Sequence, residues 1–182
     1  ISSSELPVSF SLMAADIRDL IDATRFAIST EETRYYLNGI YLHKGDAGDL
    51  CAVATDGHRL ALTRQSLPAG ATQMPAVILP RKVVGELRKL LDDFDGDVGI
   101  GLSETRVEFS FGKVRLTSKL IDGTFPDYTR VIPVGNDRIM QVDVGAFSAA
   151  VDRVSTITSE KSRSVKLGLS AGSLTLSASN AD

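Results

Sequence analysis

The residues best suited to chemistry lie together in one short stretch, Ala54-Thr55-Asp56-Gly57-His58-Arg59-Leu60. Asp56 and His58 could supply the orienting acid and the general base of a small hydrolase, provided that a nucleophile lies within hydrogen-bond reach. The same stretch carries a hydroxyl, a guanidinium and an apolar side chain, which together suit the binding of an extended peptide. The sequence therefore raises two functions of different class, hydrolysis and peptide binding.

The pattern around this stretch predicts a β-hairpin. Asp-Gly separates two runs of β-forming residues, 50–55 and 58–63. It is a strong signal for a type I′ turn, in which both central residues have positive φ. In that turn His58 and Arg59 would occupy the first positions of the second strand. An Asp beside a tight turn normally hydrogen-bonds to its own backbone, which argues against a catalytic role for Asp56.

Composition and charge exclude several other classes. With a single cysteine, Cys51, and two histidines, the chain can form no internal disulfide and has no zinc-binding pattern. We expect neither metal nor cofactor, and the cysteine usage favours a cytoplasmic setting. No apolar run approaches 18 residues, so no membrane span is expected. The net charge of −3 argues against a generally basic surface for nucleic acid but leaves room for a basic strip on one face.

Hydrophobic periodicity predicts an α+β fold made from one unit used twice. Strands are predicted over 1–12, 35–43, 50–55, 58–65, 76–79, 98–102, 106–111 and 114–119, and helices over 13–28 and 81–93. The order β-α-β-β-β therefore occurs twice, as an antiparallel domain with both helices on one side. The second helix has a buried stripe of Val83, Val84, Leu87, Leu90 and Leu91.

The last third of the chain predicts a linker followed by another domain. Residues 123–133 contain two prolines and are too irregular for a helix, whereas a strand over 138–142 and a helix over 144–156 follow. The run from Ile28 to Arg34 is similar to the run that starts 129 residues later, at Ile157. We therefore divide the chain into a complete domain, 1–133, which includes the linker, and a truncated copy of its start, 134–182. We expect a piece of a longer chain.

If the linker lies beside the hairpin, the two segments form an apolar notch. Its apolar members would be Leu60, Pro126 and Val131, and its rim would be Thr55, His58, Arg59 and Arg130. Such a notch suits a peptide with hydrophobic anchors and an acidic or polar end. Each buried Leu or Phe of that peptide would contribute roughly 1.5–3 kcal/mol.

Four motifs together resemble the bacterial DNA polymerase III β subunit, the family of replicative sliding clamps. They are Arg34-Tyr35-Tyr36-Leu37-Asn38-Gly39, Ala54 to Leu60, Pro80-Arg81-Lys82 and Phe125-Pro126-Asp127-Tyr128-Thr129-Arg130-Val131-Ile132-Pro133. The resemblance covers essentially the whole chain, with residues up to about 133 similar to the middle domain and the rest to the first half of the third. It implies a DNA-clamp fold in which antiparallel sheets lie outside and helices line the hole around duplex DNA.

The resemblance also implies a function and its residues. A clamp is a non-catalytic processivity factor that closes as a homodimer and tethers DNA polymerase, clamp loader and repair proteins through a peptide motif. The implied peptide-binding residues are Leu37, Thr55, Gly57, His58, Arg59, Leu60, Pro126, Arg130 and Val131. The implied DNA-facing residues are Arg18, Arg25, Tyr35, Tyr36, Arg81, Lys82, Arg88 and Lys89. Without the first domain and the end of the third, the chain should bind peptides weakly and should not close a ring.

Overall fold

The computed structural model describes residues 6–158 and 164–179, which form two compact units. The first unit extends to Asp127 and the second begins at Tyr128. This boundary falls inside the predicted linker, 123–133.

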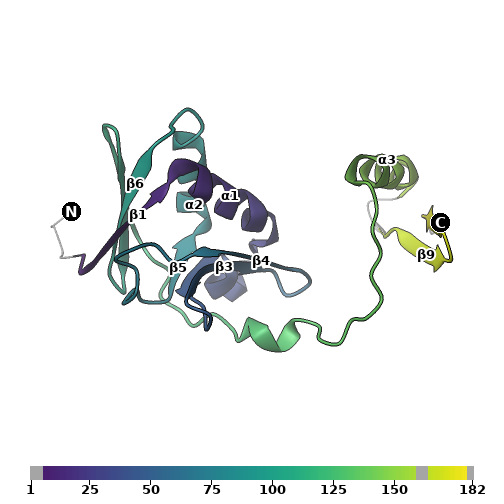
Figure 1. Ribbon diagram of the computed structural model, residues 1–182, viewed down its shortest axis with the longest axis horizontal. Helices are drawn as coiled ribbons and strands as arrows, with labels where there is room; N and C mark the ends of the chain where they lie inside the picture. Colours follow the sequence, from purple (N-terminus) through teal and green to yellow (C-terminus); the bar gives the residue numbers. More distant parts are fainter. Residues whose placement is uncertain (1–5, 159–163, 180–182) are drawn as a thin grey trace. The chain divides into compact units, whose positions relative to one another are not determined.

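The first unit contains two four-stranded antiparallel sheets among its described residues. The first sheet has the order β1-β6-β7-β8, comprising Val8–Met13, Asp97–Leu102, Arg106–Phe111 and Val114–Lys119. The second has the order β4-β3-β2-β5, comprising Leu60–Ser66, Asp49–Thr55, Gly39–Lys44 and Val77–Pro80. Helices α1, Ala14–Thr24, and α2, Arg81–Leu90, lie in the angle between the sheets (Figure 1). The predicted α+β class is confirmed.

The two halves of the unit exchange their first strands. β1 precedes α1 in the chain but pairs with β6, and β5 precedes α2 but pairs with β2. Each sheet is thus completed by a strand from the other half. The sequence predicts the repeat but not this exchange, because a hydrophobic pattern does not say which strands pair. One consequence is that the halves cannot separate without losing pairing in both sheets.

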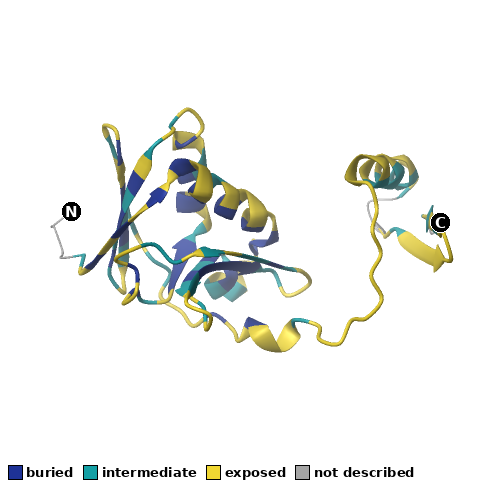
Figure 2. Cartoon of the chain, in the orientation of Figure 1, coloured by how far each residue is buried: buried dark blue, intermediate teal, exposed yellow. Residues whose placement is uncertain are grey.

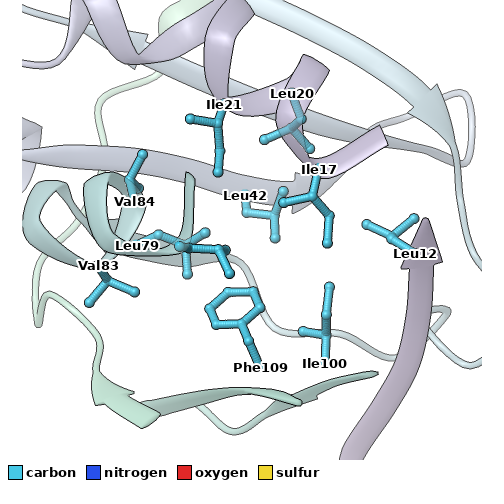
Figure 3. A pocket seen from close by; sticks show the side chains of 11 residues that line it. Leu12, Ile17, Leu20, Ile21, Leu42, Leu79, Val83, Val84, Ile100 and Phe109 are labelled. Atoms are coloured by element: carbon cyan, nitrogen blue, oxygen red, sulfur yellow. The ribbon is translucent and has the colours of Figure 1, made fainter. Parts of the chain in front are cut away.

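The core lies between the two sheets and the apolar faces of the two helices, as the buried residues in Figure 2 show. In β1, Val8, Phe10 and Leu12 are buried and alternate with exposed neighbours, as expected for a strand with one covered face. Eleven apolar side chains surround a cavity of about 20 Å³ (Figure 3). That volume is about one water molecule, and the apolar lining offers it no hydrogen-bond partner, so the cavity is a packing defect and not a ligand site.

Helix and strand boundaries differ from the prediction in places. The predicted first helix, 13–28, ends as an α-helix at Thr24 and continues as a short 3₁₀ helix, η1, Arg25–Ala27. α2 ends at Leu90 and not at residue 93. The Leu90 side chain, predicted to be buried, is 42% exposed because it lies at the edge of the apolar stripe. The strand predicted from residue 35 is wrong at its start. Residues Glu32–Leu37 form a 3₁₀ helix, η2, in which the amide of Asn38 donates to the Tyr35 carbonyl, and this local turn overrides the β preference of the tyrosines.

The second unit contains a short 3₁₀ helix, η3, Tyr128–Val131, then α3, Val144–Ser155, and a hairpin of β9, Lys166–Ser170, and β10, Ser173–Ser177. The Asp143 carboxylate accepts a hydrogen bond from the Ala146 amide and caps α3, which starts at the predicted residue, Val144. The strand predicted over 138–142 is wrong. Its counterpart in the first unit, β1, pairs with β6, and the described residues of the second unit contain no such partner.

Part of the internal similarity, 159–163, lies outside the described residues. In the described part of the chain, no helix is long and apolar enough to cross a membrane.

Candidate binding site at the β3–β4 hairpin

The loop between β3 and β4 contains four residues and not two. Thr55 pairs with Leu60, so Asp56, Gly57, His58 and Arg59 lie between the strands. Gly57 has φ of +89°, whereas no residue other than glycine has positive φ in the described chain. The predicted type I′ turn is therefore wrong, and His58 and Arg59 lie in the loop and not on the strand.

The Asp56 carboxylate holds this loop in shape. Its Oδ1 accepts hydrogen bonds from the backbone amides of His58 (2.9 Å) and Arg59 (3.0 Å), and its Oδ2 pairs with the Arg59 Nε at 3.0 Å. These bonds, first of all that from the His58 amide, lower the pKa of Asp56. The Thr55 hydroxyl donates to the Arg59 carbonyl at 2.7 Å and accepts from the Gly57 amide at 3.1 Å.

The hydrogen bonds of Asp56 argue against the hydrolase hypothesis. The Asp56 carboxylate binds the backbone of His58, so this acid is engaged in loop geometry and not in orienting an imidazole for proton transfer. Within the described residues, no group of three His, Cys, Asp or Glu side chains could hold a metal ion.

Two residues outside the hairpin support the loop, and sequence reasoning did not assign them to it. A Cβ atom on Gly57 would lie 2.5 Å from Nη1 of Arg34, so the guanidinium covers this glycine. Glu31 holds Arg34 through two hydrogen bonds, of 2.8 and 2.6 Å, which lower the pKa of Glu31 and raise that of Arg34. The Arg59 guanidinium lies 5.8 Å from the ring centroid of Phe26. Contacts with residues more than 20 positions upstream leave no local sequence signal.

The implied peptide-binding residues differ in exposure. Thr55 and Leu60 are partly exposed, Gly57, His58, Arg59 and Pro126 are exposed, and Leu37 is buried at the end of η2. Five of them share the hairpin, and Pro126 follows Phe125, whose ring stacks on Tyr41 of β2. Arg130 and Val131 belong to η3 in the second unit, where Val131 is exposed.

Several of the implied DNA-facing cations are bound to the protein's own groups. Arg18 donates to the carbonyl oxygens of Leu91 and Phe94, both at 2.7 Å, and pairs with Asp95 at 2.9 Å. Arg88 pairs with Asp22 at 2.9 Å across the two helices and also with Asp92. Their charges are therefore largely neutralised inside the unit.

The remaining implied DNA-facing residues are more accessible to solvent. Arg25 pairs with Asp22 at 3.3 Å, and Lys89 pairs with Glu86 at 3.2 Å, all on the surface. Arg81 and Lys82, in the first turn of α2, are exposed and have no ion-pair partner in the described part of the chain. On η2, Tyr35 is exposed and meets Tyr36 edge to face, with ring centroids 5.8 Å apart. Among the implied DNA-facing cations, those without an acidic partner in the described residues therefore lie at the start of α2.

Comparison with known proteins relates both parts of the chain to domains of one protein family. The family model for the central domain of the DNA polymerase III beta subunit matches residues 11–127, and that for its C-terminal domain matches residues 129–182. The beta sliding clamp of Caulobacter vibrioides is 51% identical over 182 residues, covering 98% of this chain and 49% of that protein. That of Escherichia coli K12 is 38% identical over 175 residues, covering 95% and 47%.

Solved structures of sliding clamps are similar to this chain as well. A sliding clamp from Bartonella birtlesii superposes with a TM-score of 0.93 at 55% identity, covering 97% of this chain and 48% of that one. A Caulobacter crescentus clamp superposes with a TM-score of 0.95 at 51% identity, covering 99% and 49%. The chain spans about half the length of the curated relatives that it matches. The chain belongs to the DNA polymerase III beta subunit family, the sliding clamps.

Proposed function

We propose that the protein containing this chain is a DNA replication processivity factor, a non-catalytic, cytoplasmic clamp that closes as a homodimer around duplex DNA. Its peptide-binding hairpin would tether the polymerase, the clamp loader and repair proteins. The observation that carries the proposal is the match of two consecutive clamp domains, together with 51% identity to the Caulobacter vibrioides clamp over 98% of the chain. The proposal concerns the whole protein, about half of which this chain represents.

The proposed DNA contact consists of the implied DNA-facing residues on α1, η1, η2 and α2. Arg81 and Lys82 would attract phosphates directly, while Arg25 and Lys89 would add charge already shared with acidic neighbours. Arg18 and Arg88 would act mainly by holding the two helices together. A face with few free cations attracts DNA through sequence-independent, salt-sensitive contacts without binding it tightly, as sliding requires.

The proposed peptide contact begins at the hairpin. Leu60 offers a partly exposed apolar side chain beside Thr55, and His58 and Arg59 flank it in the loop. Leu37, Pro126, Arg130 and Val131 remain part of the proposed site. The Bartonella birtlesii clamp was solved bound to griselimycin, so a close homologue carries a ligand site. A peptide with Leu and Phe anchors and an acidic end suits these groups.

A peptide titration tests the proposal. A short peptide containing leucine and phenylalanine is titrated into the isotope-labelled chain, and amide shifts are followed by NMR so that weak binding is detected. Leu60→Asp should eliminate the binding, because it puts a charge where an apolar anchor would be buried. Leu90→Asp, at an exposed leucine on α2, is the matched control and should bind as the wild type does. Unchanged affinity in Leu60→Asp would contradict the proposed site.

The hydrolase alternative predicts a different result for His58. In a clamp, His58→Ala should at most weaken peptide binding, whereas in a hydrolase it should abolish turnover of the peptide.

A further inference from the structure

The outer face of the second sheet carries a small apolar cluster that is separate from the main core. Tyr41 of β2 lies opposite Val53 on one side and Ile78 on the other. Because side chains alternate along a strand, these three residues lie on the face turned away from the helices, whereas their neighbour Leu42 is in the main core. Val53 and Ile78 are nevertheless buried. Some other segment must therefore cover this face.

The covering segment is the stretch that leads out of β8. The Ile121 amide donates to the Ile78 carbonyl at 3.1 Å, which attaches the stretch to the edge of β5. A Cβ atom on Gly123 would lie 3.0 Å from the Cβ of Tyr36, so the backbone passes close to η2. Phe125 is buried, and its ring stacks on Tyr41 with centroids 4.7 Å apart and planes 6° apart.

Tyr41 contacts a second ring as well. It stacks on His43, with centroids 4.6 Å apart and planes 27° apart. The three residues Phe125, Tyr41 and His43, here called the aromatic stack, therefore join the chain leaving β8 to β2. Stacked aromatic rings attract each other beyond the apolar area that they bury, so the pair holds Phe125 against β2.

Within the aromatic stack, Tyr41 lies in the row of residues next to the candidate peptide site. Tyr41, Val53 and Leu62 are consecutive partners across β2, β3 and β4, and the next pair toward the loop on the same face is Thr55 and Leu60. Pro126 directly follows Phe125 in the chain. We propose that Phe125 and Tyr41 are positioning residues for peptide binding, because their stack fixes Pro126 relative to Thr55 and Leu60. This inference rests on the proposed peptide-binding function.

A matched pair of substitutions tests the inference. Phe125→Leu removes the stack but keeps an apolar side chain. Phe111→Leu removes another ring pair, that of Phe111 at the end of β7 with Phe94 in the loop after α2, whose centroids are 5.1 Å apart. Peptide affinity is measured by the same NMR titration, together with thermal unfolding. Phe125→Leu should weaken peptide binding about fivefold, whereas Phe111→Leu should lower the melting temperature and leave the affinity unchanged. Tyr41→Phe keeps the ring and should bind as the wild type does.

A double-mutant cycle supplies a readout that a purely structural role would not change. Pro126→Ala should weaken binding in the wild-type background but change it less than twofold in Phe125→Leu, because Pro126 is then no longer held in place. The inference is overturned if Phe125→Leu binds like the wild type, if Phe111→Leu weakens binding equally, or if the two effects are additive. If Leu60→Asp binds normally, the proposed function itself fails. Loss of binding in Leu60→Asp with normal binding in Phe125→Leu refutes this inference alone.

Discussion

The Asp56 carboxylate orders the β3–β4 loop because two consecutive backbone amides and one guanidinium donate to it. All three donors favour its ionised form, which is why the pKa of Asp56 is lowered. A carboxylate used in this way has little capacity left to orient the neighbouring imidazole. The presence of Asp56 beside His58, the candidate catalytic pair, is therefore explained by the structure of the loop.

Replacement of Asp56 should reduce stability in a pH-dependent manner. Because the folded-state pKa is lowered, the carboxylate stabilises the fold above its unfolded pKa of about 3.9, and this contribution is lost as the pH falls through the folded value. Asp56→Ala should cost about 1 kcal/mol of unfolding free energy at pH 7 and flatten the acid limb of the stability profile. Urea unfolding measured between pH 2 and pH 7 tests both effects.

Asp46 provides the control for that experiment, since it lies in the β2–β3 turn and its side chain has no hydrogen bond within the described chain. Asp46→Ala should change stability by only a few tenths of a kcal/mol at any pH. Equal losses in the two variants would show that Asp56 has no special role in its loop.

At the scale of secondary structure, local pattern predicts elements well where one strand face or helix stripe is buried. The strands at 106–111 and 114–119 agree with the structure to the residue, and the third predicted helix, 144–156, agrees to within one. Prediction fails where individual hydrogen bonds or contacts, local or distant, set the course of the backbone. η2 replaces a strand because the Asn38 amide turns back to the Tyr35 carbonyl, and the four-residue loop is supported by Arg34 and by the Asp56 carboxylate.

For the candidate site, the sequence predicts the hairpin residues but not the residues that support the hairpin from elsewhere in the chain. The hairpin residues are contiguous, so a single motif gives Thr55 to Leu60 together. Arg34 lies on η2 and Phe26 on η1, and both meet the loop through contacts between residues far apart in the sequence. Arg18 illustrates the same limit, since the resemblance implies a DNA contact for it, whereas the sequence gives no sign that its guanidinium donates to the carbonyl oxygens of Leu91 and Phe94.

Substitution of Arg18 should therefore affect the helix pair more than DNA. Its planar guanidinium reaches two carbonyl oxygens and Asp95 at once, and an ammonium cannot reproduce this geometry. Arg18→Lys should destabilise the first unit by about 1–2 kcal/mol, whereas Arg25→Lys, at an exposed ion pair, should cost less than about 0.5 kcal/mol. Denaturant unfolding measures both. A stable Arg18→Lys variant with impaired DNA binding would favour the DNA-facing role.

For the chain as a whole, the net charge of −3 and the proposed role around DNA are compatible because charge is distributed unevenly. Arg18, Arg25, Arg88 and Lys89 all pair with acidic side chains, with Asp22 shared by Arg25 and Arg88, while Arg81 and Lys82 at the start of α2 have no acidic partner in the described chain. The strand exchange fixes α2 between both sheets, so these two cations have a defined position on a rigid unit. A surface of this kind favours weak attraction over tight binding.

The salt dependence of DNA binding tests this distribution. Each phosphate contact that is removed should reduce the slope of log affinity against log salt by about 0.9, so Arg81→Ala combined with Lys82→Ala should reduce it by up to about 1.8. Fluorescence anisotropy with a short duplex at several low salt concentrations gives the slope. Lys113→Ala, at an exposed lysine in the β7–β8 turn, is the charge-matched control and should leave the slope unchanged. If the control lowers the slope as much per charge as the paired variant does, DNA responds to net charge alone, and α2 is not the contact face.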